Sequence, residues 1–319
     1  MKHARQRGVA LLVAIVMFAI ATTVASAITY NKAMAARRAA ATFMLEQALQ
    51  AGMAAEALAG IVLEDDGSNA KTEIHEAWAE PLGPLEIEGT GVWIQAQLED
   101  LTGRFNLNSL VALQGPPLNT YKADPHQVQV FQEILTSLNI DLRYSDLLVD
   151  WIDPDNQPEP QGGEDSMYLT QIPPYRPPNT FITHTSELLA LPGFGAENYA
   201  KIAPLVTALP NTEKVNTCTA GGLVLDATAN DPQGSVAYRN DDLPKLREKA
   251  CYPLNSDYLA GIVDANAKTA AQPRVQERSS WFRLRTNIRI GTAEFVLYSV
   301  LFREMNNRVR TVQRSFGSE

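Results

Sequence analysis

Residues 9–29 read VALLVAIVMFAIATTVASAIT, residues 32–63 continue as KAMAARRAAATFMLEQALQAGMAAEALAGIVL, and these adjoining runs decide the fold. The first run carries no charge, and its 21 residues, at about 1.5 Å each, match the roughly 30 Å hydrocarbon core of a bilayer. The second run is rich in helix-forming residues and contains no proline. The sequence therefore predicts one helix over 9–63 whose first half, 9–29, spans a membrane.

The second run also predicts which face of this helix is covered. Large apolar side chains recur near helical spacing, and the predicted stripe consists of Phe43, Met44, Leu45, Leu49, Met53, Leu58, Ile61 and Val62. Because such a stripe needs cover from water, we expect it to pack against the rest of the chain.

Two kinds of leader could explain the first residues. Basic residues precede Gly8, as in a short prepilin-type leader, residues 1–8, that is cut between Gly8 and Val9. The alternative is a secretory signal peptide cut after the small residues 25–27. The apolar run is longer than a usual signal-peptide core, and no turn separates 25–27 from the following helix. These features favour the prepilin-type leader, which leaves the helix on the protein.

Composition limits what the rest of the chain can do. The 319 residues are 45% apolar and 20% charged, as expected for one or two globular domains beyond the helix. The net charge of −9 argues against a nucleic-acid partner, since phosphate binding needs clustered Lys and Arg. The four histidines are scattered and no nucleophile motif occurs, so we expect neither an enzyme nor a small-molecule substrate.

The two cysteines, Cys218 and Cys251, suit one disulfide in an oxidising compartment such as the periplasm. The alternative is two free buried thiols. The membrane helix favours export, and export favours the disulfide.

Alternating patterns predict an antiparallel sheet. Residues 92–100 alternate between apolar and polar in their middle, and residues 281–290 place Phe282, Leu284 and Ile288 on one face and arginines on the other. Turns then lead into predicted strands at 294–303 and 308–316. We expect this sheet to cover the second half of the long helix. Its parts are a pilin-like domain formed by 64–115 and 211–319.

Between these parts, residues 116–210 predict a small inserted α-helical domain. Helical spacing appears over 125–150, and two short helices are expected at 185–191 and 197–209. Residues 64–90 and the long polar stretch after Pro210 read as loops.

Oxygen-bearing side chains suggest calcium at one of two places. The first group lies in a loop of the inserted domain and consists of Asp153, Asp155, Asn156, Glu164 and Asp165. The second lies near the cysteines and consists of Asp226, Asp231, Asp241 and Asp242. Calcium prefers such oxygens, although neither spacing is that of an EF-hand. The alternative is a solvated loop whose Asp and Asn residues cap helices, and the sequence leaves this choice open.

Several segments together resemble the type II secretion system minor pseudopilin K family. They are RGVALL at 7–12, GRFNLN at 103–108, DWIDPD at 150–155, GED at 163–165 with Tyr168, PYRPPN at 174–179 and LLALPGF at 188–194. The resemblance implies a pilin-type α+β fold with an inserted helical domain. It also implies cleavage after Gly8 by prepilin peptidase, methylation of Val9, and structural calcium.

The family further implies a place at the tip of a pseudopilus. Pseudopilins generally carry a glutamate at the fifth mature position, which pairs with the amine of a neighbour, but here that position is Val13. In a subunit with no neighbour above it, a carboxylate buried at this position would cost desolvation free energy and gain no ion pair. The resemblance thus predicts a tip complex with minor pseudopilins I, J and H, anchored once in the bacterial inner membrane with its globular part in the periplasm.

Two other functions remain open from the sequence. One is a minor pilin of a type IV pilus-like system, which differs mainly in its partners. The other is a membrane-anchored periplasmic calcium-dependent binding module, which would need no amphipathic helix beyond the membrane.

Overall fold

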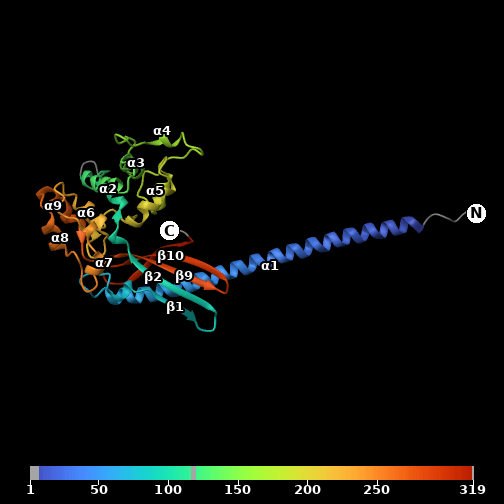
Figure 1. Ribbon diagram of the computed structural model, residues 1–319. Helices are drawn as coiled ribbons and strands as arrows, with labels where there is room; N and C mark the ends of the chain where they lie inside the picture. The colour runs from blue at the N-terminus through green and yellow to red at the C-terminus, as the bar shows by residue number, and fades with distance from the viewer. Residues whose placement is uncertain (1–6, 116–119, 318–319) are drawn as a thin grey trace, which may run out of the picture.

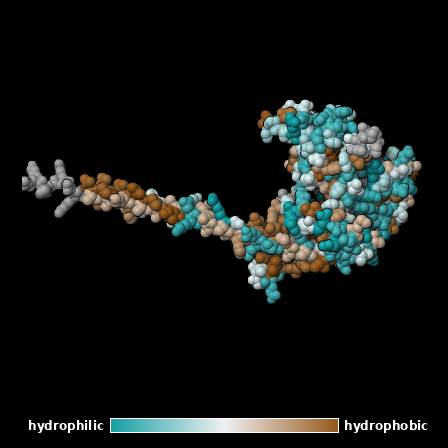
Figure 2. All heavy atoms as spheres, turned by 180° about the vertical axis from the view of Figure 1, so that it is seen from behind, coloured by the Kyte–Doolittle hydropathy of each residue, from teal (hydrophilic) through white to brown (hydrophobic). Residues whose placement is uncertain are grey.

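The computed structural model describes residues 7–115 and 120–317, which form an α+β structure on one long helix (Figure 1). This helix, α1 (Arg7–Asp66), confirms the single helix predicted over 9–63. Its first part projects away from the body, and Figure 2 shows apolar side chains along it. Within the described residues, α1 is the one helix long and apolar enough to cross a membrane. Residues 1–6 of the expected leader lie outside the described residues.

Five strands form the sheet that covers the second half of α1. They are β1 (Leu82–Ile87), β2 (Val92–Asp100), β9 (Trp281–Ile290), β10 (Ala293–Arg303) and β11 (Val309–Phe316), in the order β1-β2-β9-β10-β11 with every neighbour antiparallel. The strands expected near 92–100, 281–290, 294–303 and 308–316 are therefore confirmed. Phe282, Leu284 and Ile288 are buried beneath α1, as their alternation predicted.

The loop expected over 64–90 was partly wrong, because β1 lies inside it. This edge strand pairs with β2 through Leu85, Glu86 and Ile87, and its register shifts between Leu82 and Leu85. Gly83, at φ +94°, lies at that irregularity, where a side chain would be strained. Turn-forming residues inside the strand hid its alternation.

The predicted apolar stripe of α1 was also wrong. Small residues face the sheet instead: Ala48, Ala51, Gly52, Ala55 and Ala59. A Cβ at Gly52 would overlap the Leu297 side chain, which shows how closely helix and sheet approach. Most large side chains of the predicted stripe point outward, with Phe43 61% and Ile61 65% exposed, whereas Leu63, outside that stripe, is buried. Helix and sheet pack through a seam of small residues because large ones would hold them apart.

Buried polar contacts fix the register of α1 on the sheet. Glu56 accepts hydrogen bonds from Ser299, Thr311 and Arg314 at 2.6 to 2.9 Å. At the end of the helix, Arg303 donates to the Leu63 carbonyl at 3.2 Å and to Asp66 at 2.6 Å. These bonds satisfy groups that a helix terminus leaves open.

The insertion is larger than the expected 116–210. The sheet is interrupted between β2 and β9, and one hydrophobic core runs from Phe105 to Val275. Its longer helices are α2 (Pro125–Ser137), α3 (Arg143–Ile152), α5 (Gly195–Ile202) and α6 (Gly222–Ala229). Its short helices are α4 (Asp165–Tyr168), α7 (Leu243–Leu246), α8 (Asn255–Gly261) and α9 (Ala265–Ala271). The stretch after Pro210, read as loop, thus contains four helices whose few apolar residues join the same core.

Short strands and 3-10 turns connect these helices. The strands are β3 (Phe105–Asn106), β4 (Val111–Leu113), β5 (Tyr121–Ala123), β6 (Val206–Thr207), β7 (Val215–Asn216) and β8 (Val275–Gln276). The turns are η1 (Ala77–Ala79), before the sheet, and η2 (Leu101–Gly103), η3 (Leu107–Leu110), η4 (Thr185–Ala190), η5 (Ala203–Leu205), η6 (Tyr238–Asn240) and η7 (Gln272–Arg274). The helices expected at 185–191 and 197–209 correspond to η4 and to α5 with η5.

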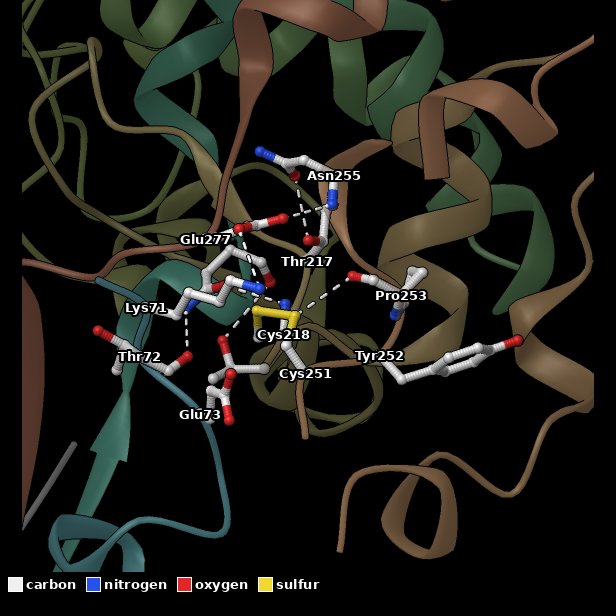
Figure 3. The surroundings of a disulfide bond; sticks show 12 residues. Lys71, Thr72, Glu73, Thr217, Cys218, Cys251, Tyr252, Pro253, Asn255 and Glu277 are labelled. Atoms are coloured by element: carbon white, nitrogen blue, oxygen red, sulfur yellow. Dashed lines mark hydrogen bonds and ion pairs between the residues drawn. A yellow bond between two sulfur atoms is a disulfide. The ribbon is translucent and has the colours of Figure 1, made fainter. Parts of the chain in front are cut away.

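A disulfide joins Cys218 to Cys251, whose Cα atoms are 4.6 Å apart (Figure 3). It links the segment before α6 to the loop before α8. Nearby, Asn255 receives a bond from Thr217 and donates one to Glu277, and Glu277 pairs with Lys71. The disulfide thus lies where the insertion meets the segment that follows α1.

Candidate metal centre

Three carboxylates meet at the end of α3. Asp153 is the C-cap of that helix, Asp155 follows in the loop, and Glu164 is the N-cap of α4. One oxygen from each lies within 4.8 Å of the others. Among the residues that the structure describes, no other three Asp, Glu, His or Cys ligand atoms come so close. We call Asp153, Asp155 and Glu164 the carboxylate cluster.

The loop returns to α3 because Asp150 holds it there. The Asp150 carboxylate is buried and accepts hydrogen bonds from the backbone N–H of Glu159 at 3.0 Å and of Gly163 at 2.6 Å. A Cβ at Gly162 would overlap the Asp150 carboxylate, so a side chain at this position would push the loop away. Asp150 therefore positions Glu164 opposite Asp153.

Several oxygens in and beside the carboxylate cluster lack a hydrogen-bond donor. Asp153 and Glu164 are only 2% and 8% exposed, yet Oδ1 of Asp153 and both carboxylate oxygens of Glu164 have no partner. Burial, together with the neighbouring carboxylates, raises the pKa of Asp153 to about 7 and that of Glu164 to about 7. Buried polar groups normally have a partner, so these oxygens are available to a proton, a water molecule or a cation.

Two residues that the sequence did not single out as ligands complete the surroundings. Asn179, at φ 48°, donates through Nδ2 to the Asp155 carbonyl at 3.1 Å, and its Oδ1 is buried without a partner. Lys122 on β5 donates to Asp155 Oδ2 at 2.6 Å. Both lie far from the loop in sequence. Asn179 belongs to the PYRPPN segment, but nothing in the sequence places it beside Asp155.

The other two residues of the first predicted group lie outside the cluster. Asn156 is exposed. Asp165 forms an ion pair with Arg176 at 3.1 Å. The prediction therefore named the three carboxylates that meet and added two neighbours in sequence that do not join them.

The second predicted group does not form a site, so this alternative was wrong. Asp226 accepts from the backbone N–H of Tyr238 at 2.7 Å and from Arg239 Nε at 2.6 Å. Asp231 accepts from Ser235 and from the Val263 N–H, Asp241 from the Tyr252 hydroxyl, and Asp242 from the Lys245 N–H. Each carboxylate thus receives at least one donor from its own chain, and the four serve as local structural links.

The chemistry of the carboxylate cluster fits calcium. Its candidate ligand atoms are the oxygens of three carboxylates, with no thiolate or imidazole among them. Calcium takes six to eight oxygen ligands, with water filling the remainder, whereas zinc favours sulfur and nitrogen. The unpartnered buried oxygens are the observation that favours an ion here.

The predicted processing residues lie at the start of α1. Gly8 and Val9 belong to the helix, and the Val9 side chain is 65% exposed. Val13 is also exposed, one turn further on. The apolar side chains in the first half of α1 are therefore exposed and can contact lipid or other helices.

Comparison with known proteins relates this fold to a secretion machinery. Residues 103–211 match the family described as type II secretion system (T2SS), protein K. The chain is 32% identical to type II secretion system protein K of Klebsiella pneumoniae, over 99% of this chain and 98% of that protein. It is 28% identical to the protein of the same name from Pseudomonas aeruginosa, over 98% of this chain and 93% of that protein.

A solved structure supports the fold. The chain is similar to one in the crystal structure of the GspK-GspI-GspJ complex from the enterotoxigenic Escherichia coli Type 2 Secretion System. The TM-score is 0.75 at 24% identity, over 88% of this chain and 100% of that chain.

Proposed function

Because the chain belongs to the type II secretion system protein K family, we propose that it is a minor pseudopilin that caps the tip of a periplasmic pseudopilus and helps to initiate its assembly. Full-length similarity to proteins of this name is the observation that carries the proposal. Within this proposal the protein has a structural role in the secretion machinery.

The exposed surface of α1 supports assembly through helices. Before Ala48 the helix makes little contact with its own body, and large apolar side chains such as Phe43 are exposed. In lipid, such a helix associates with others by close packing. The similar solved chain belongs to a GspK-GspI-GspJ complex, and we propose that this surface of α1 likewise meets minor pseudopilins I and J, and also H.

The bulk of the insertion supports a position at the tip of the pseudopilus. Figure 1 places its helices at the opposite end of the body from the projecting half of α1. A subunit stacked above would have to make room for this bulk. The absence of a carboxylate at Val13 agrees, since a tip subunit needs no partner for a neighbour's amine.

We also propose that the carboxylate cluster binds calcium. The ion would neutralise Asp153 and Glu164, whose pKa values are raised, together with Asp155 beside them. Asp153, Asp155 and Glu164 would hold it, Asn179 lies beside them, and Asp150 keeps the loop in place. Calcium would then fix the loop between α3 and α4 rather than take part in a reaction.

Processing and location complete the proposal. We propose cleavage between Gly8 and Val9 by prepilin peptidase, methylation of Val9, and a single pass through the bacterial inner membrane with the body in the periplasm. The disulfide between Cys218 and Cys251 is compatible with that oxidising compartment.

The deciding experiment is the N-terminal mass of the mature protein recovered from membranes of its host. We expect a methylated N-terminus at Val9 and, after mild solubilisation, co-purification with the I and J subunits of the same system. An N-terminus at Ile28 would contradict the proposal, because a protein without its membrane helix could not join a pseudopilus. Unprocessed protein from a Gly8→Leu variant serves as the mass control.

A further inference from the structure

A lysine is already in place beside the carboxylate cluster. Lys122 lies on β5, which pairs with β4 from Val111 to Leu113, and its ammonium donates to Asp155 Oδ2 at 2.6 Å. The lysine and the cluster lie on separate elements, so this pair is a tertiary contact. Asp155 is the cluster member that the lysine engages, whereas Asp153 and Glu164 keep unpartnered oxygens.

We propose that Lys122 is a built-in competitor for the cation of this site and sets how much calcium is needed to fill it. This inference rests on the proposed calcium site. In the metal-free protein, the ammonium partly neutralises three crowded carboxylates. When calcium binds, the same ammonium repels it and shares Asp155 with it.

Distance gives the size of this effect. Calcium lies about 2.4 Å from a carboxylate oxygen that binds it. Since the ammonium is 2.6 Å from Asp155 Oδ2, an ion on that carboxylate would be no more than about 5 to 7 Å from it. Repulsion between a divalent and a monovalent cation at this distance, even at the dielectric constant of water, weakens binding by a factor of about ten.

The charge on Lys122 is secure. The ordinary pKa of a lysine lies far above neutral pH, and Lys122 Nζ donates to a carboxylate rather than to a neutral group. The lysine therefore stays protonated at neutral pH and opposes a cation throughout the range in which the carboxylates are charged.

The inference predicts two opposite changes for Lys122→Met. Calcium affinity should rise about tenfold, because a repelling charge is gone. The melting temperature in EDTA should fall, because the carboxylates lose their counter-charge. A lysine that only packed against the loop would give a different signature, since its removal would lower both calcium affinity and stability.

The test uses the full-length protein in detergent, titrated with CaCl₂ by isothermal titration calorimetry and melted in EDTA. Lys201→Met is the matched control, since Lys201 forms an ion pair with Glu197 at 2.8 Å in the same insertion but away from the cluster. We expect the control to bind calcium as the wild type does. Lys122→Arg keeps the charge and should stay within about threefold of the wild type.

The possible outcomes separate the role of Lys122 from the existence of the calcium site. Unchanged or weaker calcium binding by Lys122→Met, with normal binding by the wild type, would overturn the role of Lys122 and leave the calcium site standing. Equal gains in Lys122→Met and Lys201→Met would reduce the effect to overall charge and overturn the inference as well. If the wild type bound no calcium at all, both the calcium site and the competitor role would be wrong.

Discussion

The two acidic regions of the insertion look alike in sequence and differ in what surrounds their carboxylates. Around Asp226, backbone N–H groups and an arginine approach the carboxylate, and its neighbours in sequence find hydroxyl or backbone donors. Around Asp153, three carboxylates face one another, and oxygens of two of them have no donor. The comparison teaches that a dense run of acidic residues does not mark a metal site. Buried oxygens without donors are the feature that distinguishes the proposed site.

The largest expected effect is the loss of stabilisation by calcium. Calcium at a hundred times its dissociation constant should stabilise the wild type by about 2.7 kcal/mol, which corresponds to roughly 4 °C in melting temperature for a chain of this size. The double variant Asp153→Asn with Glu164→Gln should show no such shift between EDTA and CaCl₂ in differential scanning calorimetry.

The second acidic region supplies the control for that prediction. Asp241→Asn with Asp242→Asn also removes two charges, and it should keep the full calcium response. If this control lost its stabilisation by calcium, or if the cluster variant kept it, the calcium site would have to be assigned to the second acidic region instead.

The next effect belongs to Asp226 and should not depend on calcium. Asp226→Ala removes the acceptor of the Tyr238 N–H and of Arg239, which also pairs with Glu133. Since Asp226 is buried but Arg239 is partly exposed, we expect a loss of about 2 kcal/mol in the free energy of unfolding. Urea titrations in EDTA and in CaCl₂ should give the same loss. A loss confined to one of them would mean that this region also responds to the metal.

The same comparison shows what the sequence could reveal about the site. Asp153, Asp155 and Glu164 were predictable because oxygen ligands clustered near the end of a helical segment. Asn179 and Lys122 were not, since 24 and 33 residues separate them from Asp155 and only the tertiary fold brings them near. Nothing in the sequence shows whether a carboxylate will find a donor. That difference separated the two acidic regions.

For the fold, periodicity worked where one face is buried and the other exposed. The alternation in 92–100 and 281–290 predicted two central strands because the sheet has α1 on one side. On α1, the larger residues suggested the wrong face. The repeat of Ala48, Ala51, Ala55 and Ala59 marked the seam, but a hydrophobicity argument gives alanine little weight. Closeness of packing, rather than hydrophobicity, chose the face.

The last expected effect is a dependence on pH that differs in sign between the two regions. The pKa values of Asp153 and Glu164, raised to about 7, lie above those of the unfolded chain, so from about pH 4 to 7 the folded state holds more protons. Stability in EDTA should therefore fall as pH rises through this window, and it should fall more steeply for the wild type than for the Asp153→Asn, Glu164→Gln variant. Urea titrations at pH 4.5 and 7.5 measure this difference.

The opposite sign is expected at Asp231, whose pKa is lowered by hydrogen bonds from Ser235 and from backbone N–H groups. A lowered pKa gives stability that is present above the unfolded value and disappears as pH falls through the folded one. The wild type should therefore lose its advantage over Asp231→Asn only below about pH 4, where the cluster is already protonated. If stability changed with pH in the same direction at both sites, hydrogen-bond donors, supplied by water, would have to reach the cluster as well. The contrast that favours a metal there would then disappear.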